Sequence, residues 1–321
     1  MANIFSLKTG NKGCFLLNNT QMNILVTGAT GYVGRNFIPK LIQGFPDSNI
    51  VTVNLSVDEA SSFFPYPQCK HISVHELPLI QKFNPHLVFH LATLYTTRDD
   101  EDIIEPILKS NIEFGVKLLH HLSCCSNLKL FVNIGSFAEY NNGPQKICNS
   151  YLYSTTKSAF RHFVEYYATL SAFKAIHLVP YSLYGGHDTT KKVIDYIRES
   201  LNSEKPVKMS EGEQILDFTH IQDLLSFFLL IIKQFDLFLQ FSVGEEFHIG
   251  TGRGTKIREL ASLMERVFDK KCNAHWGGIP YRKLDTMYAV APIEKNIRLL
   301  NWKTEISLEE GIEMYKKDHS S

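Results

Sequence analysis

The chain has 321 residues, of which 44% are hydrophobic and 21% are charged. This length and composition indicate a globular protein with either one large domain or two smaller ones. The 33 Lys and Arg residues balance the 33 Asp and Glu residues, so the formal net charge is +0. This balance argues against nucleic acid or an anionic membrane as a partner, because both select proteins with a basic excess.

The cysteines and the apolar runs bear on location. The six cysteines include no Cys-x-x-Cys pair and no zinc-like spacing with histidine, so we expect thiols in a reducing compartment and no metal site. The N-terminus lacks the order of a signal peptide, and the most apolar run, Leu224 to Ile232, is too short to cross a membrane. These features predict a cytoplasmic protein without membrane insertion. Residues 1–21 show no periodicity and are predicted to be either a flexible N-terminal extension or an artefact of start-codon choice, with Met22 as the true beginning.

Short apolar runs alternate with stretches of helical length from Met22 onward. The run from Met22 to Thr27 stops at Gly28 and is typical of a strand that is buried on both faces. This alternation predicts an α/β protein with a Rossmann-type, doubly wound parallel sheet and helices on both faces. After Tyr184-Gly185-Gly186 the pattern changes to helices with short strands, so we expect a smaller C-terminal lobe from about residue 181. The other predicted strands are residues 50–53, 87–91, 128–134 and 175–179, and predicted helices include residues 32–43, 101–122 and 151–170.

A glycine-rich loop follows the first predicted strand directly and opens the first predicted helix. Its sequence is Gly28-Ala-Thr-Gly31-Tyr-Val-Gly34. Glycines in such a loop allow a tight turn and let the backbone approach a pyrophosphate, which the helix N-terminus then stabilises. A simple strand-to-helix turn is the alternative, but the flanking strand and helix favour dinucleotide binding. The predicted cofactor contacts in this loop are Gly28, Thr30, Gly31, Tyr32, Val33 and Gly34.

The end of the second predicted strand bears on the choice of cofactor. NAD-binding proteins usually place an acid there, which holds the ribose 2′-hydroxyl. This chain has Val53-Asn54-Leu55-Ser56 instead, without a carboxylate, and Arg35 directly follows the third glycine. Arg35 is either an ordinary solvated helix residue or a ligand of a 2′-phosphate, which Asn54 would not repel. We therefore predict that NADP(H) is preferred, with NAD as the other possibility, and that Arg35 and Asn54 contact the cofactor.

Three residues form a candidate catalytic set. Tyr153 and Lys157 are spaced i, i+4 at the start of a predicted helix, so both side chains lie on one face. A nearby ammonium, together with a positive nicotinamide, stabilises a phenolate and brings the pKa of a tyrosine toward the working range. Ser136 follows a predicted strand, at the sheet edge where such folds bind ligands. The alternative is that Tyr153 and Lys157 are a surface pair and that Ser136 only shapes a turn.

Together these residues resemble the extended short-chain dehydrogenases/reductases, the branch that contains nucleotide-sugar epimerases, dehydratases and 4-ketoreductases. The resemblance covers nearly everything from Met22 onward, and it implies an NAD(P)-binding Rossmann domain over residues 22–180 and a mainly substrate-binding lobe over residues 181–321, from which residues 217–250 return to the first domain. It also implies a homodimer. The motifs that carry it beyond those above are His90-Leu-Ala92, Asn111-Ile-Glu-Phe-Gly115, Tyr184-Gly185 and Asp217-Phe-Thr-His-Ile-Gln-Asp223. The resemblance implies further cofactor contacts by Leu91, Ala92, Tyr153 and Lys157, and substrate contacts by Thr93, Ser136, Phe137 and Tyr153.

Departures from the motifs of this branch narrow the reaction. Its dehydratases carry Asp and Glu directly after the residue that corresponds to Ser136, where this chain has Phe137 and Ala138, so dehydration is not expected. The tract Gly277-Gly-Ile-Pro-Tyr-Arg282 resembles the CDP-abequose and CDP-paratose synthases, which are 4-ketoreductases. Arg282 is therefore either a ligand of the substrate diphosphate, which a guanidinium can bind through two hydrogen bonds, or a solvated loop residue.

The predicted function is NADPH-dependent reduction of the C4 keto group of a nucleotide-linked deoxysugar. In this hypothesis Tyr153 protonates the forming alkoxide, Lys157 lowers the pKa of Tyr153 and holds the nicotinamide ribose, and Ser136 orients the carbonyl oxygen. The resemblance implies a place in deoxysugar biosynthesis for the O-antigen of lipopolysaccharide. An NAD-dependent nucleotide-sugar 4-epimerase with the same three residues is one alternative, and a non-catalytic NAD(P)-binding regulatory protein is another.

Overall fold

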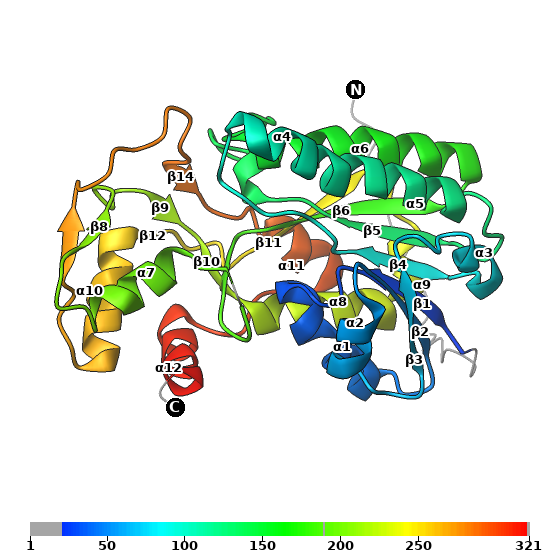
Figure 1. The fold of residues 1–321 in the computed structure, drawn as a ribbon, viewed down its shortest axis with the longest axis horizontal. Helices are drawn as coiled ribbons and strands as arrows, with labels where there is room; N and C mark the ends of the chain where they lie inside the picture. Colours follow the sequence, from blue (N-terminus) through cyan, green and yellow to red (C-terminus); the bar gives the residue numbers. More distant parts are fainter. Residues whose placement is uncertain (1–20, 189, 320–321) are drawn as a thin grey trace, which may run out of the picture.

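The computed structural model describes residues 21–188 and 190–319, and a sheet of seven parallel strands forms its centre. The strand order is β11-β6-β5-β4-β1-β2-β3 (Figure 1), which confirms the predicted Rossmann-type sheet. The N-terminal extension predicted for residues 1–21 lies outside the described residues, except for Gln21. The strands are β1 (Asn23–Thr27), β2 (Asn49–Asn54), β3 (Cys69–Ser73), β4 (Leu87–His90), β5 (Leu130–Ile134), β6 (Lys174–Pro180) and β11 (Glu245–Ile249).

Helices cover both faces of this sheet (Figure 1), and β1 shows why its strands are apolar at successive positions. Ile24 and Val26 pack in the core on the side of α1 and α8, whereas Leu25 packs in the core on the side of α5 and α6. All three side chains are fully buried, so none of these three positions is free to be polar. The helices of this lobe are α1 (Tyr32–Gly44), α2 (Val57–Phe63), α3 (Leu79–Phe83), α4 (Glu101–Leu108), the π-helical segment η1 (Lys109–Glu113), α5 (Phe114–Leu122), the 3₁₀ turn η2 (Phe137–Glu139), α6 (Leu152–Ser171), α8 (Ile221–Lys233), α9 (Phe235–Phe238) and α11 (Glu294–Leu300).

The order of the strands reverses between β1 and β4. Sheets of this kind bind ligands in the crevice at the carboxyl ends of the strands beside such a point. Two loops meet there, one from each strand: Ala92 donates its backbone N–H to Thr27 Oγ1 at 3.1 Å, and the Leu91 N–H donates to the Thr27 carbonyl oxygen at 3.2 Å. The loop after β4 is therefore fastened beside the glycine-rich loop that follows β1.

The most apolar run of the sequence lies in α8, which is a buried helix of 13 residues. Phe228 of this helix packs against Phe37 of α1 and Phe89 of β4, with ring centres 5.0 and 5.2 Å apart. Within the ranges that the structure describes, none of the helices combines the length and the apolar character needed to cross a membrane.

A smaller lobe lies beside the sheet lobe (Figure 1). It has its own apolar core, to which α7, α10 and α12 contribute buried side chains such as Ile197, Leu260 and Ile312. The chain enters this lobe after β6 and returns to the large lobe for α8, α9 and β11. It then crosses back for α10 and visits the large lobe once more for α11 before it ends in α12. Its elements are β7 (Ser182–Tyr184), α7 (Val193–Ser200), β8 (Val207–Met209), β9 (Ile215–Leu216), β10 (Phe218–His220), β12 (Thr255–Lys256), α10 (Ile257–Phe268), β13 (Ala274–Trp276), β14 (Tyr288–Ala289) and α12 (Leu308–Asp318).

Some elements differ from the predicted ones for identifiable reasons. The helix predicted over residues 101–122 is α4, η1 and α5, because a π-helical turn interrupts it one turn after Pro106. Strand β3 has the sequence Cys-Lys-His-Ile-Ser and β11 begins with two glutamates, so neither forms the apolar run that marks the other strands. They are the two edge strands of the sheet, so each lacks a neighbouring strand on one side.

Candidate active site

The glycine-rich loop brings the backbone of β1, α1 and the loop after β4 into close contact. Gly28 has a φ of +69°, and a Cβ there would lie 2.6 Å from the backbone nitrogen of Ala92. A Cβ on Gly34 would overlap the carbonyl oxygens of Gly28 and Ala29, so both positions need glycine for the packing of the loop. Gly31 differs from them: it is exposed, its φ is −79°, and a Cβ would meet only the Gly28 carbonyl oxygen, at 3.3 Å.

The residues around the crevice fit a dinucleotide. Gly31 is the N-cap of α1, no side chain caps this helix, and its first turn carries no acid, so its N–H groups are open to a pyrophosphate. At the end of β2, the amide nitrogen of Asn54 donates to Thr52, but its buried Oδ1 has no hydrogen-bond partner in the described part of the chain. An unpartnered buried acceptor at this edge suits a hydroxyl of the adenosine ribose.

Other predicted cofactor residues make contacts within the protein. Arg35 Nε donates to the Thr30 carbonyl oxygen at 2.6 Å, its Nη2 pairs with Glu59 at 3.3 Å, and its guanidinium lies 4.0 Å from the centre of the Phe63 ring. These contacts place Arg35 beside α2, on the side of the loop where β2 ends. Tyr32 instead reaches the small lobe, where its hydroxyl donates to the Gly185 carbonyl oxygen at 2.9 Å. Val33 is half-buried against the core under α1.

Tyr153 and Lys157 lie in the first two turns of α6, and both are almost fully buried. Lys157 Nζ is 5.7 Å from the centre of the Tyr153 ring. Burial lowers the pKa of Lys157 to about 8, and the negative charge of Glu139 offsets part of this effect. Burial raises the pKa of the Tyr153 phenol, whereas the Thr93 side chain acts in the opposite direction. Without a cofactor, Tyr153 is therefore held as a neutral proton donor beside a lysine that titrates not far above neutral pH.

Ser136 lies just beyond β5, at the N-cap of η2. Its hydroxyl accepts a hydrogen bond from the Ala138 N–H at 3.2 Å, and its own N–H donates to the Glu139 carboxylate at 2.7 Å. Because η2 packs against α6, Ser136 lies at the same edge of the sheet as Tyr153. The neighbouring Phe137 ring stacks on Tyr181, with ring centres 5.9 Å apart.

An acid is present near Ser136, but it does not replace the pair that the dehydratases carry. Glu139 is 0% exposed, and its carboxylate bonds to Arg161 of α6. It is therefore committed to contacts beneath the site and does not face a substrate. Glu139 therefore does not substitute for the acids that are lacking at positions 137 and 138.

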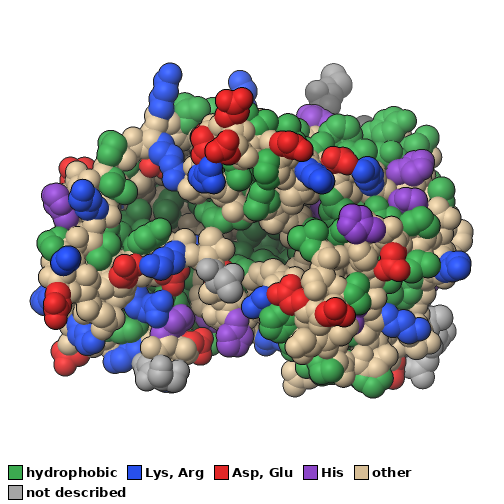
Figure 2. Space-filling view, viewed as in Figure 1, with side chains coloured by type: hydrophobic (Ala, Val, Ile, Leu, Met, Phe, Trp, Pro, Cys, Tyr) green, Lys and Arg blue, Asp and Glu red, His purple; other side chains and the backbone are tan. Residues whose placement is uncertain are grey.

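An aromatic cluster surrounds Tyr153. The Tyr95 ring meets it edge-on at 5.1 Å between ring centres, and the Tyr151 ring stacks beside it at 6.1 Å. The exposed Arg282 lies on the loop between β13 and β14, with its guanidinium 5.8 Å from the centre of the Tyr151 ring. The structure thus brings Arg282 next to the start of α6. The space-filling view shows a hollow between the two lobes (Figure 2). Tyr95 was not predicted, since it comes from a loop without periodicity and meets Tyr153 only in the folded chain.

Asn111 is a second residue of the site to which the sequence assigned no role. Its Oδ1 accepts the Leu94 N–H at 2.7 Å, and its Nδ2 donates to the Leu94 carbonyl oxygen at 3.2 Å and to Thr156 Oγ1 at 3.0 Å. It therefore ties the loop after β4 to α6. Asn111 lies in the π-helical segment η1, and the sequence carries no periodic signal for that turn.

No metal site accompanies these residues. Across residues 21–188 and 190–319, no three His, Cys, Asp or Glu side chains gather as the ligands of a metal ion would. The adjacent pair His120 and His121 lies at the end of α5, away from carboxylates that could complete a site.

The fold and the site together define an enzyme of the extended short-chain dehydrogenase/reductase type. The chain belongs to the NAD dependent epimerase/dehydratase family, whose profile matches residues 24–250. Its membership agrees with the resemblance found in the sequence.

Relatives and solved structures are similar over most of the chain. A CDP-abequose synthase of Yersinia pseudotuberculosis is 26% identical over 270 residues, which cover 83% of this chain and 91% of the relative. A CDP-abequose synthase of Salmonella typhimurium is 24% identical and covers 90% of this chain and 96% of the relative. Among solved structures, the UDP-glucuronic acid 4-epimerase of Bacillus cereus in complex with UDP-glucuronic acid and NAD has a TM-score of 0.79 at 21% identity, with 93% of this chain and 100% of that chain covered. This likeness shows a shared fold.

Proposed function

We propose that the protein reduces the C4 keto group of a nucleotide-linked deoxysugar with NADPH. The observation that carries the proposal is the similarity to CDP-abequose synthases over 83% and 90% of the chain. The tract from Gly277 to Arg282 resembles the same enzymes and supplies a guanidinium at the start of α6. The lack of acids at Phe137 and Ala138 supports a redox step without dehydration.

The proposed mechanism assigns one role to each side chain of the catalytic set. Bound NADPH supplies the hydride that C4 receives. Ser136 donates a hydrogen bond to the carbonyl oxygen and orients it toward Tyr153. Tyr153 gives its phenolic proton to this oxygen as negative charge develops on it, and the Lys157 ammonium stabilises the phenolate that remains. Burial raises the pKa of Tyr153 and keeps the phenol protonated, which is the form that reduction requires.

We further propose that NADP(H) is preferred over NAD. Asn54 carries no charge at the end of β2, and Arg35 lies on that side of the glycine-rich loop. The partner of Arg35 is Glu59, which is about half exposed and can turn into solvent when a 2′-phosphate binds. NAD remains the other possibility, because solved structures of similar fold contain NAD.

A nucleotide-sugar 4-epimerase is the second candidate. Ser136, Tyr153 and Lys157 serve both reactions, and the solved structures with a similar fold include epimerases with UDP-sugars. The two reactions differ in how the cofactor is used. An epimerase oxidises and then reduces the same substrate and retains its NAD, whereas a reductase releases NADP⁺ and takes up NADPH in every cycle.

We propose a homodimer in the cytoplasm as the working form. Apolar side chains are exposed on α4 and α6, and they include Ile104, Leu108, Tyr166 and Leu170. Their exposed fractions of 44–62% support a partner surface on these helices. The cysteines of the described part of the chain are all free thiols, which supports a reducing compartment.

The test is to incubate purified protein with NADPH and a CDP-4-keto-3,6-dideoxyhexose and to measure the oxidation of NADPH by its loss of absorbance. We expect turnover with NADPH and loss of turnover in Tyr153→Phe. The same preparation is assayed with UDP-glucose for formation of its C4 epimer, and its bound cofactor is released and identified. If the protein retains NAD, epimerises C4 and reduces no 4-keto nucleotide sugar, the reductase proposal is wrong and the protein is a 4-epimerase.

A further inference from the structure

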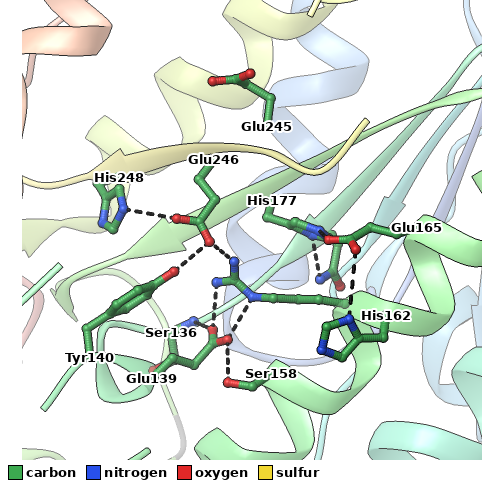
Figure 3. Close-up of polar contacts among 12 residues, drawn as sticks. Ser136, Glu139, Tyr140, Ser158, His162, Glu165, His177, Glu245, Glu246 and His248 are labelled. Carbon is green, nitrogen blue, oxygen red and sulfur yellow. Dashed lines mark hydrogen bonds and ion pairs between the residues drawn. The ribbon is translucent and has the colours of Figure 1, made fainter. Parts of the chain in front are cut away.

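A buried ionic cluster lies next to Ser136, one of the candidate catalytic residues (Figure 3). Its members are Glu139 of η2, Arg161 of α6 and Glu246 of β11. Glu139 is 0% exposed and Arg161 4% exposed, whereas the Glu246 side chain is 30% exposed. The guanidinium of Arg161 binds Glu139 through Nε at 2.8 Å and Nη2 at 3.1 Å, and it binds Glu246 through Nη1.

The two carboxylates differ in what else they contact. Glu139 Oε1 accepts the backbone N–H of Ser136 at 2.7 Å, and its Oε2 accepts the hydroxyl of Ser158 at 3.0 Å. Ser158 is the residue after Lys157, so both of these contacts lead to the catalytic set. Glu246 instead accepts the hydroxyl of Tyr140 at 2.5 Å and contacts no residue of that set.

A buried ion pair contributes little net free energy to the stability of a turn. Desolvation of both charges offsets most of their attraction, and an apolar pair of similar volume is often as stable. The proposed reaction uses neither carboxylate. The position of Glu139, which is hydrogen-bonded both to Ser136 and to Ser158, the residue after Lys157, offers a reason for keeping the charges.

We propose that Glu139 is a positioning residue of the active site, which fixes the main chain of Ser136 and sets the electrostatic environment of Lys157, with Arg161 as its counter-charge. Glu139 acts through these residues and does not touch the substrate. The inference rests on the proposed role of Lys157 in the reaction, although its electrostatic part can be measured without a substrate.

The charges around Lys157 determine the direction in which its pKa should change in each variant. Glu139 raises the pKa of Lys157, and Arg161 lowers it, while burial lowers it most. His90 also faces Lys157, but burial lowers the pKa of His90 to about 3, so this ring is neutral over the working range. Tyr153 is a further titratable neighbour, which is neutral until it gives up its proton. Among residues 21–188 and 190–319, Glu139 and Arg161 are thus the charges that act on Lys157, and they act in opposite directions.

The test is a double-mutant cycle of Glu139→Gln and Arg161→Gln, with Glu246→Gln as the matched control. In Glu139→Gln the alkaline limb of kcat should move to lower pH by about one pH unit, since a nearby opposite charge is lost. At a fixed pH on that limb this is about a tenfold loss of activity. KM should stay within about twofold, because ligand contacts are unchanged. Arg161→Gln should move the limb to higher pH, and the double variant should return toward the wild type.

The control separates this role from support of the fold. Glu246→Gln removes a carboxylate from the same guanidinium and should leave the limb in place, although all variants are expected to lower Tm. If the limb moves in the same direction in Glu139→Gln and Arg161→Gln, or moves equally in Glu246→Gln, the cluster only stabilises the fold and the inference is wrong.

A second measurement does not depend on turnover. In protein labelled with ¹³C-lysine, the Lys157 signal is assigned by its loss in Lys157→Met and titrated by NMR in the wild type and in each variant. Opposite shifts of its midpoint in Glu139→Gln and Arg161→Gln support the inference even if no 4-keto sugar is reduced. An unchanged midpoint in both variants overturns it, even if the reductase assay succeeds.

Discussion

The three glycines of the loop after β1 are expected to respond differently to substitution by alanine. At Gly31 the backbone is compatible with alanine, and the nearest atom to a new Cβ is 3.3 Å away. Loss of glycine at an N-cap and restriction of the unfolded chain have opposite effects of about 0.5–1 kcal/mol each, so Tm should change by no more than about 2 °C. The new methyl group nevertheless lies on the open side of the loop, where the pyrophosphate has to approach.

The loss of cofactor binding in Gly31→Ala should be large. Weakening charge-assisted hydrogen bonds to the pyrophosphate costs about 1.5–3 kcal/mol, which is roughly a tenfold to hundredfold loss of affinity. NADPH at 100 times the wild-type Kd stabilises the wild type by about 2.7 kcal/mol, but a variant that binds a hundredfold more weakly gains only about 0.4 kcal/mol. Thermal unfolding with and without NADPH measures both quantities in one experiment.

Gly34→Ala is the matched control with the opposite profile. Its Cβ would overlap two carbonyl oxygens of the loop, so overpacking should cost about 1–3 kcal/mol and lower Tm by several degrees even without cofactor. Wild-type NADPH stabilisation in Gly31→Ala would refute the placement of the pyrophosphate at this loop. An equal fall in Tm in both variants would refute the distinction drawn between the two glycines.

Three further substitutions test the catalytic and cofactor residues. Tyr153→Phe should lower kcat by about 10²–10⁴-fold with little change in KM, because it removes the proton donor and keeps the ring. Arg35→Met should raise KM for NADPH by about tenfold or more and leave KM for NADH unchanged. An equal effect on both KM values would show that Arg35 does not bind the 2′-phosphate. Lys157→Met should abolish turnover yet raise the stability of the cofactor-free protein at pH 7, since burial lowers the pKa of Lys157 from 10.5 to about 8. Between these two pH values the unfolded wild type binds more protons than the folded wild type. The free energy of unfolding of the variant should therefore exceed that of the wild type by about 3 kcal/mol below pH 8, and this difference should vanish toward pH 10.5. A constant difference across that range would contradict the assignment.

The fold could be predicted because its signals are local. Residues 22–27 are centred on the apolar run Ile24-Leu25-Val26, and glycines follow from Gly28 on, so β1 and its loop are marked in the sequence itself. The same holds for Tyr153 and Lys157, which one helix presents on one face. The roles of these residues in catalysis stay predictions, as does the division of the chain into domains.

What the sequence did not disclose depends on distant partners. Glu139 and Arg161 are 22 residues apart, and Glu246 is 85 residues beyond Arg161. An isolated acid such as Glu139, which follows Ala138, forms no pattern that predicts burial, and only the folded chain pairs it with an arginine. The contact of Tyr95 with Tyr153 was not predicted for the same reason, since Tyr95 lies in a loop with no periodicity.

The return of the chain to the large lobe affects how this protein folds during synthesis. Helix α8, which packs beside α1 on one face of the sheet, begins at Ile221, and the edge strand β11 ends at Ile249. Until those residues have left the ribosome, Phe37 and Phe89 lack the Phe228 ring that packs on them in the finished sheet. A nascent chain released at the end of β6 would present this apolar face to solvent and to other nascent chains. We therefore expect that a fragment of residues 1–180, expressed alone, yields aggregated protein.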